Sequence, residues 1–217
     1  GLPLRAAIAD LASRRGDAPG AAQTRREAAE RLGVNPDAPT LLVTGGSLGA
    51  LHVNESMTSA ADALPVGAQV VHLTGRGKDE PVRAAVEAAG CSDRWHVIDY
   101  LTTMQDALAV ADLVVCRSGA GTVAEMEALG LPCIYVPLPI GNGEQRLNAA
   151  DHVAAGGAQL IDDKDFTADF VRSNVFPLLG SARLADMAAA SQSLGRAGAA
   201  RALADLALEQ VKESGRE

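Results

Sequence analysis

A glycine-rich segment and the glutamate that follows it have the residue types expected of a site for a phosphorylated ligand. Residues 112–116 form an apolar run typical of a buried strand, residues 118–122 have the sequence Ser-Gly-Ala-Gly-Thr, and residues 123–129 are rich in helix formers. A helix N-terminus after such a turn favours an anion, because its backbone N–H groups are unpaired and its dipole is positive there. Glu125 follows Thr122 by three positions on the same helix face, where its carboxylate can accept hydrogen bonds from ribose hydroxyls. Together these residues predict a nucleotide site.

A second glycine turn, residues 45–49 with the sequence Gly-Gly-Ser-Leu-Gly, follows another apolar run. It could bring its backbone and the Ser47 hydroxyl against a phosphate or a sugar. It is not the GxGxxG dinucleotide fingerprint, and it lacks the Lys-Ser/Thr ending of a P-loop. A tight turn that only packs a helix on the sheet is the alternative.

The hydrophobic pattern along the chain predicts six strands that alternate with helices. We expect strands over residues 40–44, 68–73, 95–98, 112–116, 131–136 and 158–161. We expect helices over 4–13, 23–32, about 50–64, 79–89, 104–109, 123–129, 144–155 and from 165 to the end with a break at 176–178, and a linker over 14–22. This alternation is typical of an α/β fold with a doubly wound parallel six-stranded sheet, Rossmann-like, whose ligands bind beyond the carboxyl ends of the strands.

Composition limits the possible functions. The 217 residues are 47% apolar, which suffices for one large α/β domain, and the net charge of -8 and 3% aromatic content disfavour nucleic acid as a partner. The acidic balance also disfavours adsorption to anionic lipid. Three cysteines without disulfide or metal-ligand spacing fit a reduced cytosol, and we find no signal peptide and no apolar run of about 20 residues.

Several motifs, taken in order along the chain, resemble one family. They are Gly1-x-Pro-x-Arg5, Gly45-Gly-Ser-x-Gly-Ala50, Cys116-Arg-Ser-Gly-Ala120-x-Thr-x-x-Glu125, Gly130-Leu-Pro132, Pro137 and Gln145-x-x-Asn148. In order and spacing this set resembles the MurG family of bacterial peptidoglycan N-acetylglucosaminyltransferases, which are two-domain GT-B enzymes. The resemblance covers essentially the whole chain and only the C-terminal, donor-binding half of the family. It implies that residues 1–217 are one nucleotide-sugar domain and that the N-terminal acceptor domain is absent from this chain.

The resemblance also implies roles for individual residues. Arg5 would reach the nucleotide, Ser47 would lie near the diphosphate, and the backbone of Leu101 would contact the uracil edge. The segment that would hold diphosphate and ribose comprises Ala120, Gly121, Thr122, Val123, Ala124 and Glu125. Gln145 would contact the sugar hydroxyls, and further candidates are Gly46, Ser118, Glu144 and Asn148.

Each of these assignments has a purely structural alternative. Glu125 and Arg5 could be solvated surface charges, and Thr122 an ordinary first-turn residue. Gln145 and Asn148, three positions apart, could cap or decorate a helix. By itself, Leu101 would be interpreted as a core residue.

The activity implied by the resemblance is inverting transfer of N-acetylglucosamine from UDP-GlcNAc to the C4 hydroxyl of the muramyl sugar in a polyprenyl-diphosphate-linked MurNAc-pentapeptide. No metal would be required, although Mg²⁺ on the diphosphate is compatible with it. The catalytic base and the surface that meets the cytoplasmic face of the bacterial membrane, as a peripheral protein, would belong to the missing half. The alternatives are another GT-B enzyme, such as a glycolipid glycosyltransferase or a UDP-GlcNAc 2-epimerase, and a non-catalytic UDP-sugar-binding module.

Some other features predict no site. Residues 163–165, Asp-Lys-Asp, mimic a DxD metal motif, but we expect them to lie away from the cleft, with Asp165 as a helix N-cap. The four histidines have no ligand spacing, so we expect no metal site. The stripe formed by Val53, Met57, Ala60 and Leu64 should be core. The pairs Arg14-Arg15 and Arg25-Arg26 should be solvated.

Overall fold

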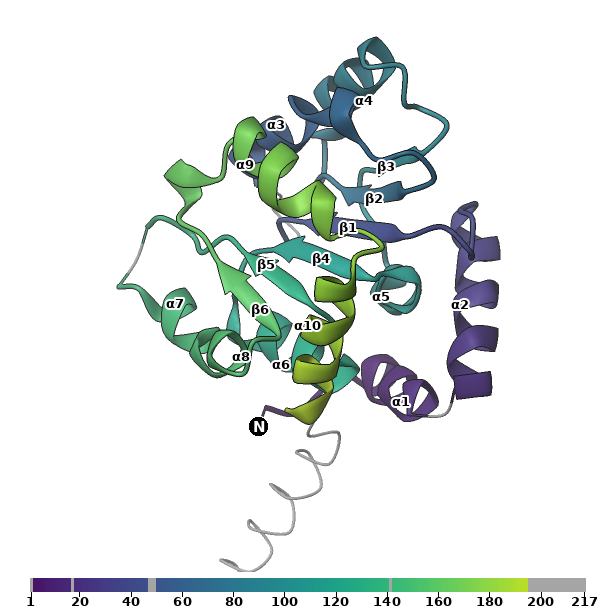
Figure 1. The fold of residues 1–217 in the computed structure, drawn as a ribbon, viewed down its shortest axis with the longest axis vertical. Helices are drawn as coiled ribbons and strands as arrows, with labels where there is room; N and C mark the ends of the chain where they lie inside the picture. The colour runs from purple at the N-terminus through teal and green to yellow at the C-terminus, as the bar shows by residue number, and fades with distance from the viewer. Residues whose placement is uncertain (1, 17, 47–49, 141, 195–217) are drawn as a thin grey trace, which may run out of the picture.

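The computed structural model describes residues 2–16, 18–46, 50–140 and 142–194, and these form a parallel six-stranded sheet with helices on both faces (Figure 1). The strand order is β3-β2-β1-β4-β5-β6. The strands are β1 (Thr40–Thr44), β2 (Gln69–Leu73), β3 (Trp95–Ile98), β4 (Leu113–Cys116), β5 (Cys133–Tyr135) and β6 (Ala158–Leu160). The predicted doubly wound α/β fold is therefore confirmed, and every predicted strand is present within two residues of its expected ends.

The central strands are buried on both sides, because helices cover each face of the sheet. All positions of β1, β2, β4 and β5 are buried, which explains why these strands appear in the sequence as mainly apolar runs. In the centre, Leu42 of β1 pairs with Val71 of β2 and with Val114 of β4.

The helices that flank the sheet vary widely in length. They are α1 (Ala6–Arg15), α2 (Ala18–Leu32), α3 (Leu51–Thr58), α4 (Asp79–Ala88), α5 (Met104–Val110), α6 (Ala120–Leu129), α7 (Glu144–Asn148), α8 (Ala150–Ala154), α9 (Ala168–Phe170) and α10 (Ala182–Ser193). Short 3-10 turns lie at Ala61–Ala63, Asp163–Asp165 and Phe176–Leu178, and a π turn lies at Val171–Val175. None of the helices in these described ranges is long and apolar enough to cross a membrane.

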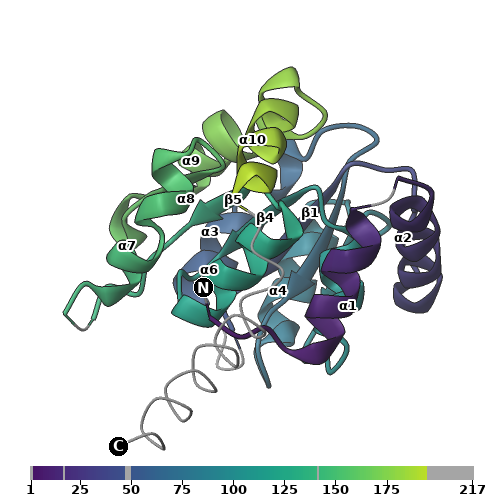
Figure 2. The ribbon, with the colours of Figure 1, turned by 90° about the horizontal axis from the view of Figure 1, so that it is seen from below.

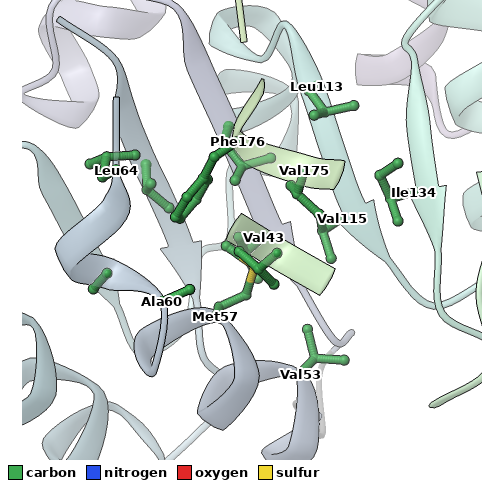
Figure 3. Close-up of a cluster of buried hydrophobic side chains, with 14 of the residues drawn as sticks. Val43, Val53, Met57, Ala60, Leu64, Leu113, Val115, Ile134, Val175 and Phe176 are labelled. Carbon is green, nitrogen blue, oxygen red and sulfur yellow. The ribbon is translucent and has the colours of Figure 1, made fainter. Parts of the chain in front are cut away.

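Helices cover both faces of the sheet (Figure 2). Two hydrophobic clusters hold these layers together, one on each face of the sheet. In the first, the predicted stripe of α3 and the turn after it packs with Val43 of β1 and with Phe176 (Figure 3). In the second, α1, α2, α5 and α6 cover the other face through residues such as Ile8 and Met126. The prediction of a core stripe at Val53, Met57, Ala60 and Leu64 is confirmed.

Several predicted helix boundaries are wrong. The linker expected over 14–22 is mostly helix, because α2 begins at Ala18 and tolerates Pro19 in its first turn, where no intrahelical N–H donor is needed. α3 ends at Thr58 instead of near Leu64, and the helix expected over 144–155 is divided into α7 and α8. Asp165 is not an N-cap: the side chain of Thr167 accepts from Phe170 N at 3.2 Å and caps α9.

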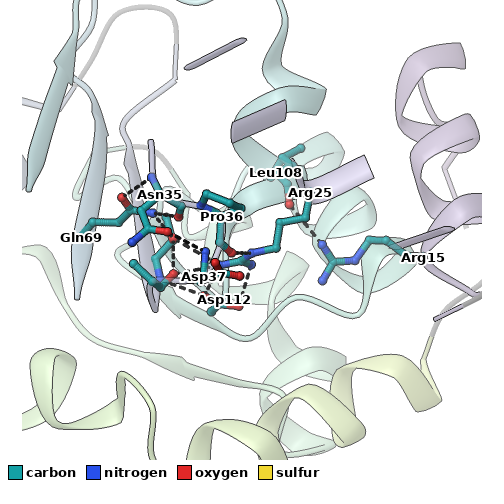
Figure 4. Close-up of polar contacts among 10 residues, drawn as sticks. Arg15, Arg25, Asn35, Pro36, Asp37, Gln69, Leu108 and Asp112 are labelled. Atoms are coloured by element: carbon teal, nitrogen blue, oxygen red, sulfur yellow. Dashed lines mark hydrogen bonds and ion pairs between the residues drawn. The ribbon is translucent and has the colours of Figure 1, made fainter. Parts of the chain in front are cut away.

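Arg25 was expected to be solvated, and instead it joins the amino ends of two strands (Figure 4). Its Nη1 and Nη2 donate to the two carboxylate oxygens of Asp112, both at 2.9 Å, and its Nε donates to Pro36 O at 2.7 Å. Asp112 Oδ2 also accepts from Thr40 N at 2.8 Å, so the loop before β1 is tied to the loop before β4. Arg15 is also half-buried and donates to Leu108 O at 3.2 Å; burial lowers the pKa of its guanidinium.

Candidate functional site

A cleft of about 300 Å³ lies at the carboxyl edge of the sheet, where β1 and β4 are neighbours and the strand order reverses. In doubly wound sheets this switch point is the usual place for a ligand. The residues that line the cleft are Arg5, Thr44, Gly46, Leu73, Gly75, Asp99, Tyr100, Leu101, Met104, Cys116, Arg117, Gly119, Thr122, Glu125, Met126 and Gln145. Six of the predicted site residues are among them: Arg5, Gly46, Leu101, Thr122, Glu125 and Gln145.

The N-terminus of α6 opens toward this cleft. Gly119 is its N-cap, with φ -63° and ψ 145° and no side-chain cap, and Val123 N makes the first helical bond to Gly119 O at 3.0 Å. The helix begins three residues earlier than predicted. Residues 120–122 are therefore its first turn, where N–H groups have no acceptor within the helix. With no acidic side chain in that turn, this end of α6 is positive and suits an anion.

Arg5 and Glu125 lie in direct contact on the wall of the cleft. Arg5 Nε donates to Glu125 Oε1 at 2.7 Å, and Arg5 Nη2 donates to Glu125 Oε2 at 2.9 Å. The Glu125 side chain is 13% exposed and the Arg5 side chain 60% exposed. The two residues thus form an ion pair between chain segments that are far apart in sequence.

The α7 helix carries the two predicted amide side chains, Gln145 and Asn148. Gln145 Oε1 accepts from Leu138 N at 3.0 Å, and Gln145 is among the residues that line the cleft. Asn148 Nδ2 donates to Ser118 O at 3.1 Å, so it ties α7 to the turn before α6. Glu144 is exposed, accepts from Asn142 Nδ2 at 3.0 Å and does not line the cleft.

The remaining predicted residues lie at or behind the same edge. Ala120 and Gly121 are exposed at the start of α6, and Ala124 is half-buried on that helix. Val123 has its side chain in the core and its N–H within the helix, so neither is free for a ligand. Ser118 is buried, and its Oγ has no hydrogen-bond partner among the described residues. Ser47 lies outside the described residues.

Arg117, Tyr100 and Asp99 are among the residues that line the cleft and were not predicted. Arg117 Nη1 donates to Val136 O and Pro137 O, both at 3.0 Å, and pairs with Asp163. Asp163, which we expect to lie away from the cleft, does not line it, but its carboxylate pairs with Arg117, which does. Tyr100 lies under the Arg76 guanidinium, 3.9 Å from ring centroid to Cζ, and Asp99 accepts from Gly77 N at 2.6 Å. The sequence could have indicated these residues, because Arg117 comes directly after β4, and Asp99 and Tyr100 come after β3.

His72 precedes Leu73, which lines the cleft, but its own side chain is fully buried in the core. Its Nδ1 accepts from Trp95 Nε1 at 3.2 Å, and its Nε2 lies 3.0 Å from Asn54 Oδ1. Burial lowers its pKa to about 3, so His72 is neutral and cannot meet a substrate. Among the residues with described positions, no group of three or more His, Cys, Asp or Glu side chains is arranged to hold a metal ion.

Together, the switch-point cleft, the open helix N-terminus and a carboxylate one turn later define a doubly wound α/β domain with a cleft suited to a phosphorylated ligand. Within this class, the chain belongs to the family described as glycosyltransferase family 28 C-terminal domain, which residues 40–203 match.

Curated relatives extend this similarity over nearly the whole chain. The chain is 48% identical to the UDP-N-acetylglucosamine--N-acetylmuramyl-(pentapeptide) pyrophosphoryl-undecaprenol N-acetylglucosamine transferase of Bifidobacterium longum, over 99% of this chain and 58% of that protein. It is 42% identical to the protein of the same name from Streptomyces coelicolor, over 97% of this chain and 56% of that protein. The chain therefore spans little more than half the length of these relatives.

Solved structures agree with this assignment. Acinetobacter baumannii MurG superposes with a TM-score of 0.70 at 27% identity, over 84% of this chain and 52% of that one. A putative UDP-N-acetylglucosamine 2-epimerase from Listeria monocytogenes gives a TM-score of 0.61 at 19% identity, over 85% of this chain and 47% of that one, and shares the fold alone.

Proposed function

We propose that this chain is the donor-binding half of an inverting N-acetylglucosaminyltransferase of peptidoglycan synthesis. The donor is UDP-GlcNAc, and the acceptor is the muramyl sugar of an undecaprenyl-diphosphate-linked MurNAc-pentapeptide. One observation carries the proposal: the first turn of α6 and the Glu125 carboxylate face one cleft at the switch point, in a chain 48% identical to a transferase named for this reaction.

In this proposal each border of the cleft binds one part of the donor. Backbone N–H groups of residues 120–122 bind the diphosphate, and Glu125 accepts from the ribose hydroxyls. The backbone at Leu101 contacts the uracil edge, and Gln145 contacts the sugar. Ser47 lies near the diphosphate in the glycine turn after β1.

When UDP leaves, negative charge develops on its diphosphate. The cleft already contains hydrogen-bond donors that can stabilise this charge. The dipole and free N–H groups of α6 stabilise charge that develops on the leaving diphosphate. Arg117, held by Asp163 and two carbonyls, places a guanidinium at the same end of the sheet, although the Asp163 carboxylate offsets its charge. The proposal therefore needs no metal, and Mg²⁺ on the diphosphate would add to this stabilisation.

The acceptor and the membrane are assigned to the other half of the enzyme. An undecaprenyl chain keeps the acceptor in a lipid bilayer, and in this proposal the full-length enzyme meets it as a peripheral protein at the cytoplasmic face. We assign the acceptor site, the catalytic base and the membrane contact to the N-terminal half of the full-length enzyme.

The first test is base selectivity. We expect the chain to bind UDP more tightly than ADP or GDP, because backbone groups around Leu101 match the edge of uracil. Calorimetric titration with the three diphosphates measures this directly. Equal affinity for all three would contradict a uridine site.

The second test removes the predicted ribose ligand. Glu125→Ala should weaken UDP binding by about 1–3 kcal/mol, the cost of losing a charge-assisted hydrogen bond. UDP without ribose hydroxyls should bind the variant and the wild type alike. Glu87→Ala, at an exposed glutamate of α4, is the matched control and should bind UDP as the wild type does. A Glu125 variant that still distinguishes UDP from the deoxy form would contradict the assignment.

A further inference from the structure

Arg5 and Glu125, which are 120 positions apart in the sequence, form an ion pair in the proposed nucleotide site. The geometry of this pair determines how the Glu125 carboxylate is oriented there. The two distances, 2.7 Å and 2.9 Å, join two nitrogens of one planar guanidinium to the two oxygens of the carboxylate. A forked pair of this kind fixes the plane of the carboxylate as well as pairing its charge.

Both partners are fixed by the fold. The carbonyl of Arg5 accepts from Ile8 N at 2.9 Å and from Ala9 N at 3.0 Å, so Arg5 is the N-cap of α1. α1 packs against α6 through the core cluster that contains Ile8 and Met126. Glu125 lies in the second turn of α6, and the pair is therefore held at a set distance from the helix N-terminus that faces the cleft.

Burial makes the pair asymmetric. The Glu125 side chain is 13% exposed, so without a partner its ionised form would lose most of its hydration. The Arg5 side chain is 60% exposed and keeps contact with water. A carboxylate has about four lone-pair sites, and the fork occupies two of them, which leaves two acceptor sites on a group that lines the cleft.

We propose that Arg5 is a positioning residue for the ribose. It holds the Glu125 carboxylate in the plane in which the remaining lone pairs accept hydrogen bonds from the hydroxyls of a uridine nucleotide. This inference rests on the proposed function, which supplies the nucleotide. It assigns the effect of Arg5 to the ribose through Glu125, instead of to a direct contact with the diphosphate.

The experiment measures which part of the ligand depends on Arg5. Calorimetric titrations with UDP, 2′,3′-dideoxy-UDP and uridine would be made on the wild type, Arg5→Gln, Glu125→Gln and the double variant. We expect Arg5→Gln to reduce the preference for UDP over dideoxy-UDP by about tenfold, the value of one charge-assisted hydrogen bond. The preference for UDP over uridine, which measures the phosphates, should not change. In the Glu125→Gln background, Arg5→Gln should have no further effect on the ribose preference.

Two further variants separate positioning from folding. Arg5→Lys keeps the charge but not the fork, so it should restore only part of the ribose preference. Arg83→Gln removes another exposed arginine that is paired with a carboxylate, Asp79; neither residue lines the cleft, so every preference should stay unchanged. Thermal unfolding of each variant reports its stability independently.

Each opposing outcome has a distinct meaning. If Arg5→Gln weakens UDP and dideoxy-UDP equally and leaves uridine unaffected, Arg5 contacts the diphosphate and the inference is wrong. If the wild type binds UDP without preferring it over the dideoxy form, the inference also fails while the uridine site stands. Failure of the wild type to bind UDP at all overturns the proposed function and this inference together.

Discussion

The buried histidine of β2 shows how neighbouring donors fix the protonation state of one side chain. An indole N–H can only donate, so His72 Nδ1 accepts from Trp95 and the proton is on Nε2, directed at Asn54 Oδ1. The amide of Asn54 donates in turn to Thr74 O at 3.0 Å. If Nδ1 also carried a proton, it would face the Trp95 N–H donor inside the buried core, and His72 is therefore neutral in the folded state.

A pH dependence of stability follows at this residue scale. His72 has an unfolded pKa near 6.5 and a folded pKa of about 3, so only the unfolded state takes up a proton between these values. Stability is therefore complete above pH 6.5 and falls as the pH drops toward 3, by about 2 kcal/mol at pH 5 from this group. Urea unfolding at pH 7 and pH 5 measures the loss, and His72→Gln should reduce it by about that amount. An unchanged loss in the variant would show that His72 is already charged in the fold.

At the scale of elements, strands were predictable from sequence and helix ends were not. A run such as residues 40–44 is buried at every position and apolar at its three central ones because two layers cover it, and its short length is typical of a strand. Gly16, Pro19 and Gly20 indicated a linker, yet α2 passes through two of them because its Ala28 and Ala29 are buried in the core cluster that it shares with α5 and α1. Tertiary packing outweighed local propensity there, and it cannot be read from one segment.

The contact between β6 and α10 depends on a glycine. Gly157 precedes β6, and a Cβ there would lie 2.4 Å from Ser191 Oγ and 2.6 Å from a His152 ring carbon. Ser191 Oγ lies 2.6 Å from His152 Nε2, and Tyr135 Oη lies 2.9 Å from His152 Nδ1, so this buried chain of side chains links α10, α8 and β5.

Substitution of this glycine tests the element contact. Gly157→Ala should destabilise the fold by about 1–3 kcal/mol, because the added methyl group overpacks a buried hydrogen-bonded cluster. Gly121→Ala is the matched control: its Cβ meets no atom within 4 Å, and helix propensity should stabilise it by about 0.5–1 kcal/mol. Chemical denaturation of both variants measures the difference. Equal stability of the two would mean that α10 shifts freely to accommodate the methyl group.

At the scale of the whole molecule, the cleft is built from segments that only the folded sheet brings together. The motifs predicted which turns would meet at the carboxyl edge, because parallel strands end on one side. They could not show that Arg5 pairs with Glu125, that Asp163 holds Arg117, or that Arg25 joins two strands, since each pair depends on which helix face meets which loop. Ion pairs between residues far apart in the sequence produce no periodic pattern from which they could be predicted.

The last prediction concerns what this polypeptide does by itself. Glycosyl transfer needs a base near the acceptor hydroxyl and a cleft closed against water. Among the described residues that line the cleft, the two carboxylates are already engaged: Glu125 pairs with Arg5, and Asp99 accepts from Gly77 N. His72, the nearest buried histidine, is enclosed in the core. We therefore expect the 217-residue chain to bind UDP without transferring GlcNAc to a lipid-linked acceptor.

Both properties can be measured on one preparation, by calorimetric titration with UDP and by transfer of labelled sugar to a short-chain acceptor analogue. The full-length Bifidobacterium longum relative, of which this chain matches 58%, is the positive control for transfer. Because the relative supplies the other half of the cleft, only it should turn over. Turnover by the isolated chain at about 1 per second or more, the ordinary range for enzymes, would place the base within these residues. The engaged carboxylates would then have to be released during the reaction, and the Arg5–Glu125 pair would be the first to examine.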